Sequence, residues 1–247
     1  MFNKLSARLL VGLVVSTLAS SAYAQMSSLA QAEQFRMQYP SAKITCDVAL
    51  YHADELTKSR IYEVYSSTDN RAVVLFKSAA EAGQKVLINK EKFWMFMPKS
   101  RRPIRITPMQ KLLGEASLGD VATLNWTEQY QVVKEQLNGD KIELQLQATQ
   151  HSGSYQRINL TLNAADKFPL SADLYLRSGM LAKTAQFKRG MLNGKPAVVQ
   201  MTLLDRMRPD QKTIIRYRDV TPLTIPDKLF NPQILLRSDI DQLLADE

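Results

Sequence analysis

Residues 92–97 read KFWMFM, and this short stretch limits the fold more than any other. Side chains along an extended strand alternate between its two faces. One face of this strand carries Phe93, Met95 and Met97, and the other carries Trp94 and Phe96. An antiparallel strand usually leaves one face in water, so two apolar faces predict that both are covered. We expect one face to pack on a helix and the other to meet an interior, a lid or an apolar ligand.

A second strand has the same character, because residues 73–76 (VVLF) are also apolar on both faces. Methionine is pliable and fits irregular apolar guests, although it often simply fills gaps in a core. The residues predicted to line an apolar cavity are Trp94, Phe96, Met95, Met97 and Phe76, with Leu112 and Leu113 on a lid. The sequence leaves open which strand face turns inward, and a solid core is the alternative for each residue.

The segment that follows, residues 108–125 (PMQKLLGEASLGDVATLN), does not have the pattern of a strand. Its apolar residues are spaced as in one or two short helices broken at two glycines: Leu112, Leu113, Leu118 and Val121, with breaks at Gly114 and Gly119. A helical segment inserted between strands of one long sheet is what a lid across the concave side of that sheet would look like.

The main charged feature lies between the apolar strand and this segment. It is a basic run that follows Pro98 and contains Pro103, and its charged residues are Lys99, Arg101, Arg102 and Arg105. Guanidinium groups at the mouth of an apolar cavity suit anionic headgroups or the acidic patch of a partner. We therefore predict that Arg101, Arg102 and Arg105 assist headgroup or partner docking, with a merely solvated turn as the alternative.

Most of the remaining chain alternates between apolar and polar residues, which is typical of half-buried strands. Examples are Ile142, Leu144 and Leu146 on one face of a strand that carries Glu143, Gln145 and Gln147 on the other. Hairpin turns are indicated by Asn138-Gly139, Ser178-Gly179 and Asn193-Gly194. The pattern predicts a mainly β protein with about eleven antiparallel strands in one sheet and no domain linker.

Helices are predicted at both ends of this β region. Residues 28–39 have apolar residues at helical spacing, a serine to cap the start and Pro40 to end the helix. The C-terminus from Asn231 to Asp246 is predicted to be a last helix, with Pro232 in its first turn.

The N-terminus resembles a secretory signal peptide. Lys4 and Arg8 form a basic region, residues 9–18 form an apolar stretch too short to span a bilayer, and Ala22-Tyr23-Ala24 fits a cleavage site. We predict cleavage after Ala24, so that residues 1–24 are the signal peptide and residues 25–247 form a single domain. An exported protein in the periplasm is the expectation, which also argues against nucleic acid as a partner.

Little of the chain suits catalysis. The 247 residues carry a formal charge of +8, one cysteine and two histidines. Motifs for a nucleophilic serine, a phosphate-binding loop or a zinc protease do not occur. Cys46 is expected to be a buried, inert thiol, and His52 and His151 are expected to be solvated loop residues. We predict neither an enzyme nor a metal site nor a cofactor.

The residues 93–122, FWMFMPKSRRPIRITPMQKLLGEASLGDVA, resemble the LolA-like outer-membrane lipoprotein-sorting proteins. The positions that carry the resemblance are Trp94, Phe96, Pro98, Arg101, Arg105, Ile106, Gly114 and Gly119-Asp120. The closing residues 225–232 (IPDKLFNP) also look like the end of that family. The resemblance implies an incomplete β-barrel, in which a strongly bent sheet and capping helices enclose an apolar cavity that holds acyl chains.

Two functions follow as expectations from the resemblance. The first is a periplasmic carrier or chaperone that binds the acyl chains of a lipoprotein or lipid. It would transfer them between the inner and outer membranes with an inner-membrane exporter and an outer-membrane acceptor, and it would touch membranes only transiently. The alternative is a module with the same half-barrel that senses envelope components or reports to a membrane partner.

Overall fold

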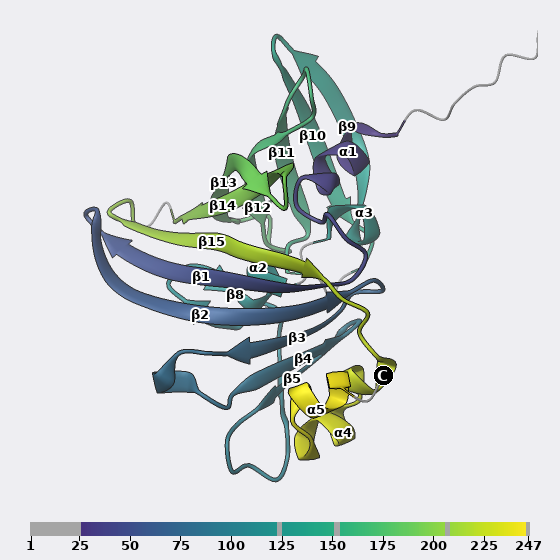
Figure 1. Cartoon of the computed structure of the whole chain (residues 1–247). Coiled ribbons are helices and arrows are strands. Elements are labelled where there is room, and N and C mark those ends of the chain that lie inside the picture. Colours follow the sequence, from purple (N-terminus) through teal and green to yellow (C-terminus); the bar gives the residue numbers. More distant parts are fainter. Residues whose placement is uncertain (1–25, 123–124, 151–153, 206–207, 246–247) are drawn as a thin grey trace, which may run out of the picture.

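The computed structural model describes residues 26–122, 125–150, 154–205 and 208–245, and it is dominated by one large antiparallel sheet (Figure 1). Its strands are β1 (Ala42–His52), β2 (Glu55–Ser67), β3 (Arg71–Phe76), β4 (Lys85–Asn89), β5 (Lys92–Phe96), β6 (Ile104–Ile106), β9 (Tyr130–Asn138), β10 (Lys141–Ala148), β11 (Arg157–Asn163), β12 (Pro169–Tyr175), β13 (Leu181–Leu192), β14 (Lys195–Leu204) and β15 (Gln211–Pro222). A separate small hairpin consists of β7 (Lys111–Leu113) and β8 (Ala116–Ser117).

Helices are short and few in the described part of the chain. They are α1 (Ser28–Gln34), α2 (Leu118–Ala122), α3 (Trp126–Gln129), α4 (Pro232–Arg237) and α5 (Ile240–Ala245), with the 3-10 turns η1 (Ala79–Glu81) and η2 (Asp227–Phe230). Within those residues, no helix has the length and apolarity needed to cross a membrane. The predicted signal peptide, its cleavage after Ala24 and the loop residue His151 lie outside the described residues.

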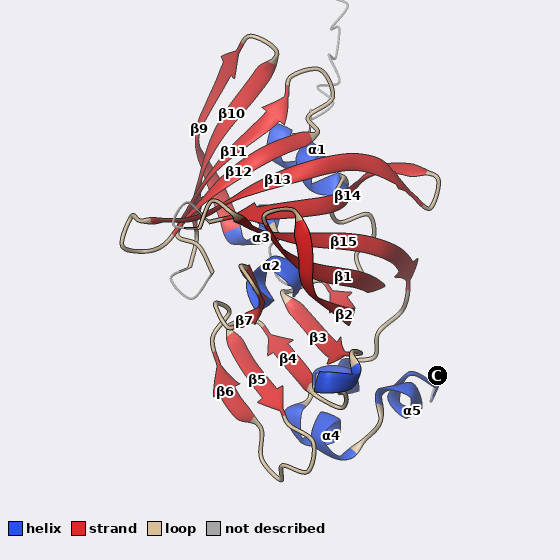
Figure 2. Ribbon diagram, turned by 90° about the vertical axis from the view of Figure 1, so that its left-hand side faces the viewer, coloured by secondary structure: helices blue, strands red, loops and turns tan. Residues whose placement is uncertain are grey.

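The strand order confirms the expected single sheet, with thirteen strands rather than about eleven. The order runs β6-β5-β4-β3-β2-β1-β15-β14-β13-β12-β11-β10-β9, and every neighbouring pair is antiparallel. The two edge strands, β6 and β9, do not pair with each other, so the sheet stays open as an incomplete barrel. It bends so that its two halves surround α2 and the small hairpin (Figure 2).

The alternation predicted from residues 92–97 and 73–76 holds in the structure, because both faces of β3, β4 and β5 are covered. Val74, Ile88 and Phe93 belong to the large core on the inner face. Val73 and Leu87 belong to a second core on the outer face. The sheet is therefore the middle layer of three at this end of the molecule.

The outer layer is made by the C-terminal segment, whose Leu229, Phe230, Leu235 and Leu243 pack on the outer face. The structure has two helices where the sequence predicted one. The first helix, α4, ends before Ser238, whose backbone is extended with ψ of 150°. The ammonium of Lys85 donates to the carbonyls of Leu235 and Ser238 at 2.8 and 3.1 Å, which satisfies the end of α4 and stops it there. Asn231 and Pro232 begin the segment as predicted, with the Asn231 side chain accepting from the backbone of α4.

The inner face is covered by α1, α3 and the segment between β6 and α3. Helix α1 ends at Gln34, five residues earlier than predicted, because the chain continues in tight turns there. Leu29 and Ala32 of α1 and Trp126 of α3 belong to the inner core. The Glu33 carboxylate joins the two helices by accepting from the Trp126 backbone N–H at 3.0 Å.

Candidate functional site

The candidate site is the inner face of the sheet together with residues 108–122, which we call the lid segment. The helix predicted over Leu112 and Leu113 was wrong: these residues form β7 of the small hairpin, and only α2 is helical. The hairpin forms because Gly114 turns the chain with a left-handed φ of +54°. Leu113, Leu118 and Val121 are buried in the inner core, so the lid segment fills the space that the bent sheet encloses.

The two glycines noted in the sequence are the points where the lid segment approaches the rest of the protein most closely. A Cβ atom on Gly114 would collide with the Thr213 hydroxyl and lie 2.8 Å from a methyl carbon of Leu50. A Cβ atom on Gly119 would collide with the Ser154 hydroxyl and lie 3.0 Å from its Cβ. Only glycine fits at either position without movement, and this explains the residue type better than helix breaking does.

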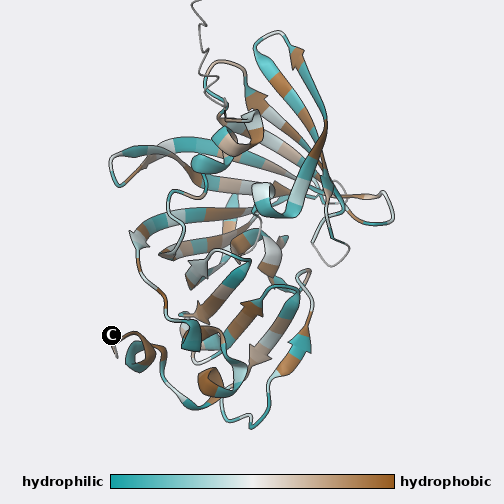
Figure 3. Cartoon of the chain, turned by 90° about the vertical axis from the view of Figure 1, so that its right-hand side faces the viewer, coloured by the Kyte–Doolittle hydropathy of each residue, from teal (hydrophilic) through white to brown (hydrophobic). Residues whose placement is uncertain are grey.

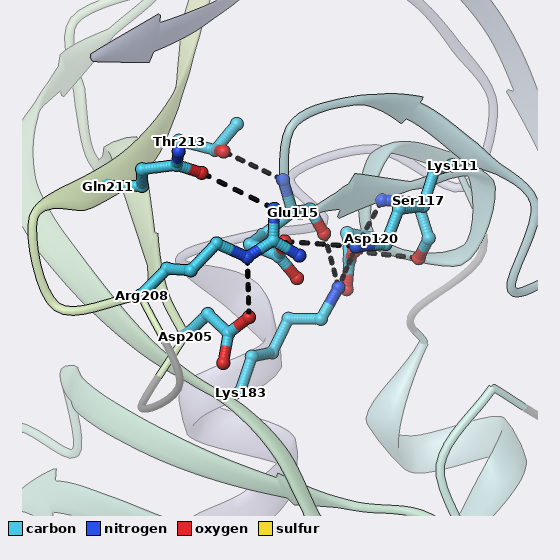
Figure 4. Close-up of polar contacts among 9 residues, drawn as sticks. All are labelled: Lys111, Glu115, Ser117, Asp120, Lys183, Asp205, Arg208, Gln211 and Thr213. Carbon is cyan, nitrogen blue, oxygen red and sulfur yellow. Dashed lines mark hydrogen bonds and ion pairs between the residues drawn. The ribbon is translucent and has the colours of Figure 1, made fainter. Parts of the chain in front are cut away.

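A buried polar network holds the lid segment in place (Figure 4). Asp120 lies at its centre and accepts four hydrogen bonds, although only 2% of the residue is exposed. The Ser117 backbone N–H and hydroxyl donate to Oδ2 at 2.8 and 2.7 Å. The Tyr155 hydroxyl donates to Oδ1 at 2.7 Å, and the Lys183 ammonium donates to Oδ2 at 2.9 Å.

Lys183 attaches this network to the sheet. It lies on β13 with 3% of the residue exposed, and it also donates to the backbone carbonyl of Glu115. The Glu115 backbone N–H donates to the Thr213 hydroxyl on β15 at 2.8 Å. The Lys111 ammonium forms an ion pair with the Glu115 carboxylate, with 2.9 Å between Nζ and Oε1. A buried cation costs several kcal/mol unless it is paired and hydrogen-bonded, so Lys183 strongly favours the state in which the lid segment covers it.

Sequence reasoning did not identify this network. A signal was available, because Lys183 occupies the apolar phase of its strand together with Ala185 and Phe187.

Burial raises the pKa of the Tyr155 hydroxyl well above its ordinary value, and the neighbouring Asp120 carboxylate raises it further. Tyr155 therefore stays protonated and keeps donating to Asp120.

The space left beside the lid segment is small. A cavity of about 60 Å³ lies between the sheet and α2, with Val64, Val121 and Tyr217 in its lining. This volume holds a few water molecules and not an acyl chain. An acyl chain could therefore enter this cavity between the sheet and α2 only if the lid segment moved.

The structure divides the predicted cavity residues between the two faces. Phe76 and Met95 lie on the inner face, and Leu112 and Leu113 of the lid segment pack against the same core. Trp94 and Phe96 instead face outward and pack against the C-terminal helices, so they do not line the interior. The reason is the phase of β5, in which Phe93 and Met95 turn inward. Met97 is 37% exposed at the end of the strand.

The predicted docking arginines also separate. Arg101 and Arg102 are exposed in the loop between β5 and β6. Arg105 is exposed too, but its guanidinium carbon lies 4.7 Å above the ring of Trp94 on the outer face. Arg105 therefore contributes to packing, while the other two point their charges into water.

The remaining candidates for chemistry are structural residues. Burial raises the pKa of the Cys46 thiol to about 12, so this thiol is not reactive at neutral pH. The His52 side chain is half exposed and lies 3.1 Å from Asp210. The burial of Cys46 agrees with the interpretation from sequence. His52 is solvated as expected, but it is the last residue of strand β1 and not a loop residue.

Comparisons with known proteins agree with this architecture. A family model described only as "Uncharacterized protein" matches residues 68–237. A LolA superfamily protein from Nitrosomonas europaea is 26% identical with a TM-score of 0.75, covering 83% of this chain and 96% of its own. A domain from Vibrio parahaemolyticus, named for outer-membrane lipoprotein sorting, is 20% identical with a TM-score of 0.65, covering 85% and 97%.

A DUF1329 family protein from Desulfovibrio piger is 17% identical with a TM-score of 0.64, covering 84% of this chain and 96% of its own. These last two likenesses concern the fold. The search of curated proteins found no match.

Proposed function

The chain belongs to the family of that model and is a LolA-like protein, and from this premise we propose that it is a periplasmic carrier of acyl chains. The cargo would be a lipoprotein or a lipid, passed from an inner-membrane exporter to an outer-membrane acceptor. One observation carries the proposal: the inner face of an open sheet is apolar, and an inserted segment covers it instead of the sheet closing on itself.

The energetics of exchange suit a carrier. Each methylene group removed from water contributes about 0.8 kcal/mol, so a long acyl chain has ample driving force. Leu113, Leu118 and Val121 of the lid segment are buried, so they already keep water from part of the inner face. The net free energy of cargo binding is therefore the difference between the burial of the cargo and the burial of the lid segment that it replaces. If this difference is small, cargo can be both loaded and released, as a carrier between two membranes requires.

Opening the lid segment has a polar cost as well as an apolar one. The buried contacts of Lys183 with Asp120 and with the Glu115 carbonyl must be broken or hydrated. Water reaching the interior, or a partner that binds the lid segment, would replace them. We therefore assign the control of opening to the exporter and the acceptor rather than to cargo alone.

The test is native mass spectrometry and lipid extraction on protein purified from its own periplasm, followed by titration with a fluorescent fatty acid. Met95→Gln changes the inner face and is expected to weaken binding about tenfold or more. Leu75→Gln is the matched control, because Leu75 is a partly buried residue on the outer face of the sheet. A protein that carries no lipid and binds no fatty acid would rule out the carrier.

A further inference from the structure

The free edge of the sheet at β6 presents apolar and basic side chains together. Strand β6 pairs only with β5, and Met95 lies opposite Ile104 in their register. At this edge Ile104 is 53% exposed and Met97 is 37% exposed. Both extend the apolar inner face beyond the part that the lid segment covers. The loop that joins β5 to β6 lies at the lower end of the molecule in Figure 2.

Three cations lie beside these apolar side chains. Lys99, Arg101 and Arg102 are all exposed in the joining loop. The ion pairs found among the described residues use other groups, so these three charges have no acidic partner there. In Figure 3, the strands at the lower end of the molecule carry alternating hydrophobic (brown) and hydrophilic (teal) bands. Unpaired positive charge next to exposed apolar groups fits a surface that is anionic outside and apolar beneath.

The loop holds a defined shape. The Ser100 backbone N–H donates to the Met97 carbonyl at 3.1 Å, and the Ser100 hydroxyl donates to the Arg102 carbonyl at 2.8 Å. Lys99 adopts a left-handed φ of +66°, which sharpens the turn. The three charges are thus presented by a turn that is ordered before any partner arrives, and this lowers the entropy lost on docking.

We propose that Met97, Lys99, Arg101, Arg102 and Ile104 form a docking edge for an anionic lipid surface. The occupant is a membrane rather than a protein, because a specific protein interface buries about 800 Å² on each partner. Two apolar side chains and one turn supply much less than that. Shallow insertion of a few apolar groups, assisted by basic residues near anionic headgroups, is sufficient for reversible membrane attachment.

This inference goes beyond the carrier function and does not require it. Docking would place the edge of the inner face, where the lid segment begins, against the bilayer. The protein would therefore bind a membrane in one orientation, with the β6 edge of the sheet toward the bilayer.

The experiment measures partition onto vesicles of phosphatidylcholine alone and of phosphatidylcholine mixed with phosphatidylglycerol. The mature chain is expected to bind only the mixed vesicles, and less as salt is added, because salt screens the attraction. Arg101→Glu with Arg102→Glu is expected to lower partition by at least about 30-fold. Met97→Ser with Ile104→Ser is expected to lower it about tenfold, because the apolar insertion is lost.

Matched controls separate the edge from the bulk properties of the chain. Lys134→Glu with Lys141→Glu makes the same charge change on exposed positions of β9 and β10. Met180→Ser with Met191→Ser removes two methionines that are 62% and 60% exposed elsewhere. Both controls are expected to bind mixed vesicles as the unmodified chain does. Thermal unfolding followed by circular dichroism checks that each variant is folded.

Two results would overturn the docking edge: no preference for anionic vesicles, or equal losses in edge variants and controls. Fatty-acid titration of the same variants keeps the two proposals apart, because the edge variants should still bind the probe. Vesicle binding without fatty-acid binding would reject the carrier and keep the docking edge. Fatty-acid binding without a preference for anionic vesicles would reject the docking edge and keep the carrier.

Discussion

The ammonium nitrogen of Lys183 lies 2.9 Å from a carboxylate oxygen of Asp120, and 3% and 0% of the two side chains are exposed. This pair joins the sheet to the lid segment across the interior of an otherwise apolar face. A buried ion pair often contributes no more stability than apolar residues of the same size would. Its effect here is positional, because Lys183 lies on β13 and Asp120 lies on α2, so the pair fixes the lid segment against the sheet.

Lys183→Met is expected to lower the free energy of unfolding by about 3 kcal/mol or more, because it leaves the Asp120 charge buried without its cation. Urea denaturation measures the change. Lys188→Met is the matched control on an exposed position of the same strand and should change stability by less than about 0.5 kcal/mol. Adding Asp120→Asn to Lys183→Met should recover part of the loss. Equal effects at Lys183 and Lys188 would contradict the role of the pair.

Gly119→Ala is expected to displace the lid segment, because the new Cβ atom would collide with Ser154. Overpacking of this kind typically costs about 1–3 kcal/mol. Hydrogen exchange should become faster over β7, β8 and α2 and stay unchanged in β10 and β11. Ser154→Ala removes the hydroxyl from the collision and should partly restore protection in the double variant. Unchanged exchange in Gly119→Ala would show that the lid segment adjusts without cost.

Trp94→Ala is expected to destabilise the protein by about 2 kcal/mol, less than a fully buried tryptophan, because Trp94 is partly exposed. The lost contacts are with the C-terminal helices, so limited proteolysis should cut α4 and α5 sooner. Fatty-acid binding should not change. Arg105→Ala should cost about 0.5–1 kcal/mol through its lost contact with the Trp94 ring, and Arg101→Ala should cost less. Weakened fatty-acid binding in Trp94→Ala would contradict its outward placement.

Glu33→Gln is expected to change how stability depends on pH. Burial raises the pKa of Glu33 above 4.5, against the opposing effects of Arg36 and the Trp126 N–H. A carboxyl group with a raised pKa in the folded state contributes stability below its unfolded pKa and loses that contribution as the pH rises through the folded pKa. Relative to the unmodified chain, Glu33→Gln should therefore gain stability as the pH rises from below 4.5 toward neutrality.

Urea denaturation at several pH values measures this trend. Glu135→Gln provides the comparison, because Glu135 is an exposed carboxylate. A constant difference between Glu33→Gln and the unmodified chain across the pH range would contradict the prediction.

The sequence by itself determined that both faces of the strand at residues 92–97 are covered and that most of the chain forms one antiparallel sheet. Local alternation carries this information, because the apolar pattern of a strand fixes which side chains share a face. It also identified the lid segment, through the loss of alternation and the two glycines. These are properties of neighbours along the chain, and no distant contact is needed to predict them.

Only the tertiary structure decided which face of that strand turns inward. Trp94 and Met95 are both large and mainly apolar, and the choice between them follows from the C-terminal helices, which pack on the side of the sheet that holds Trp94 and Phe96. The hairpin in the lid segment likewise depends on the fit of Gly114 against Leu50 and Thr213. Lys183 and Asp120 are 63 residues apart, so their pairing exists only once the sheet has bent around the lid segment.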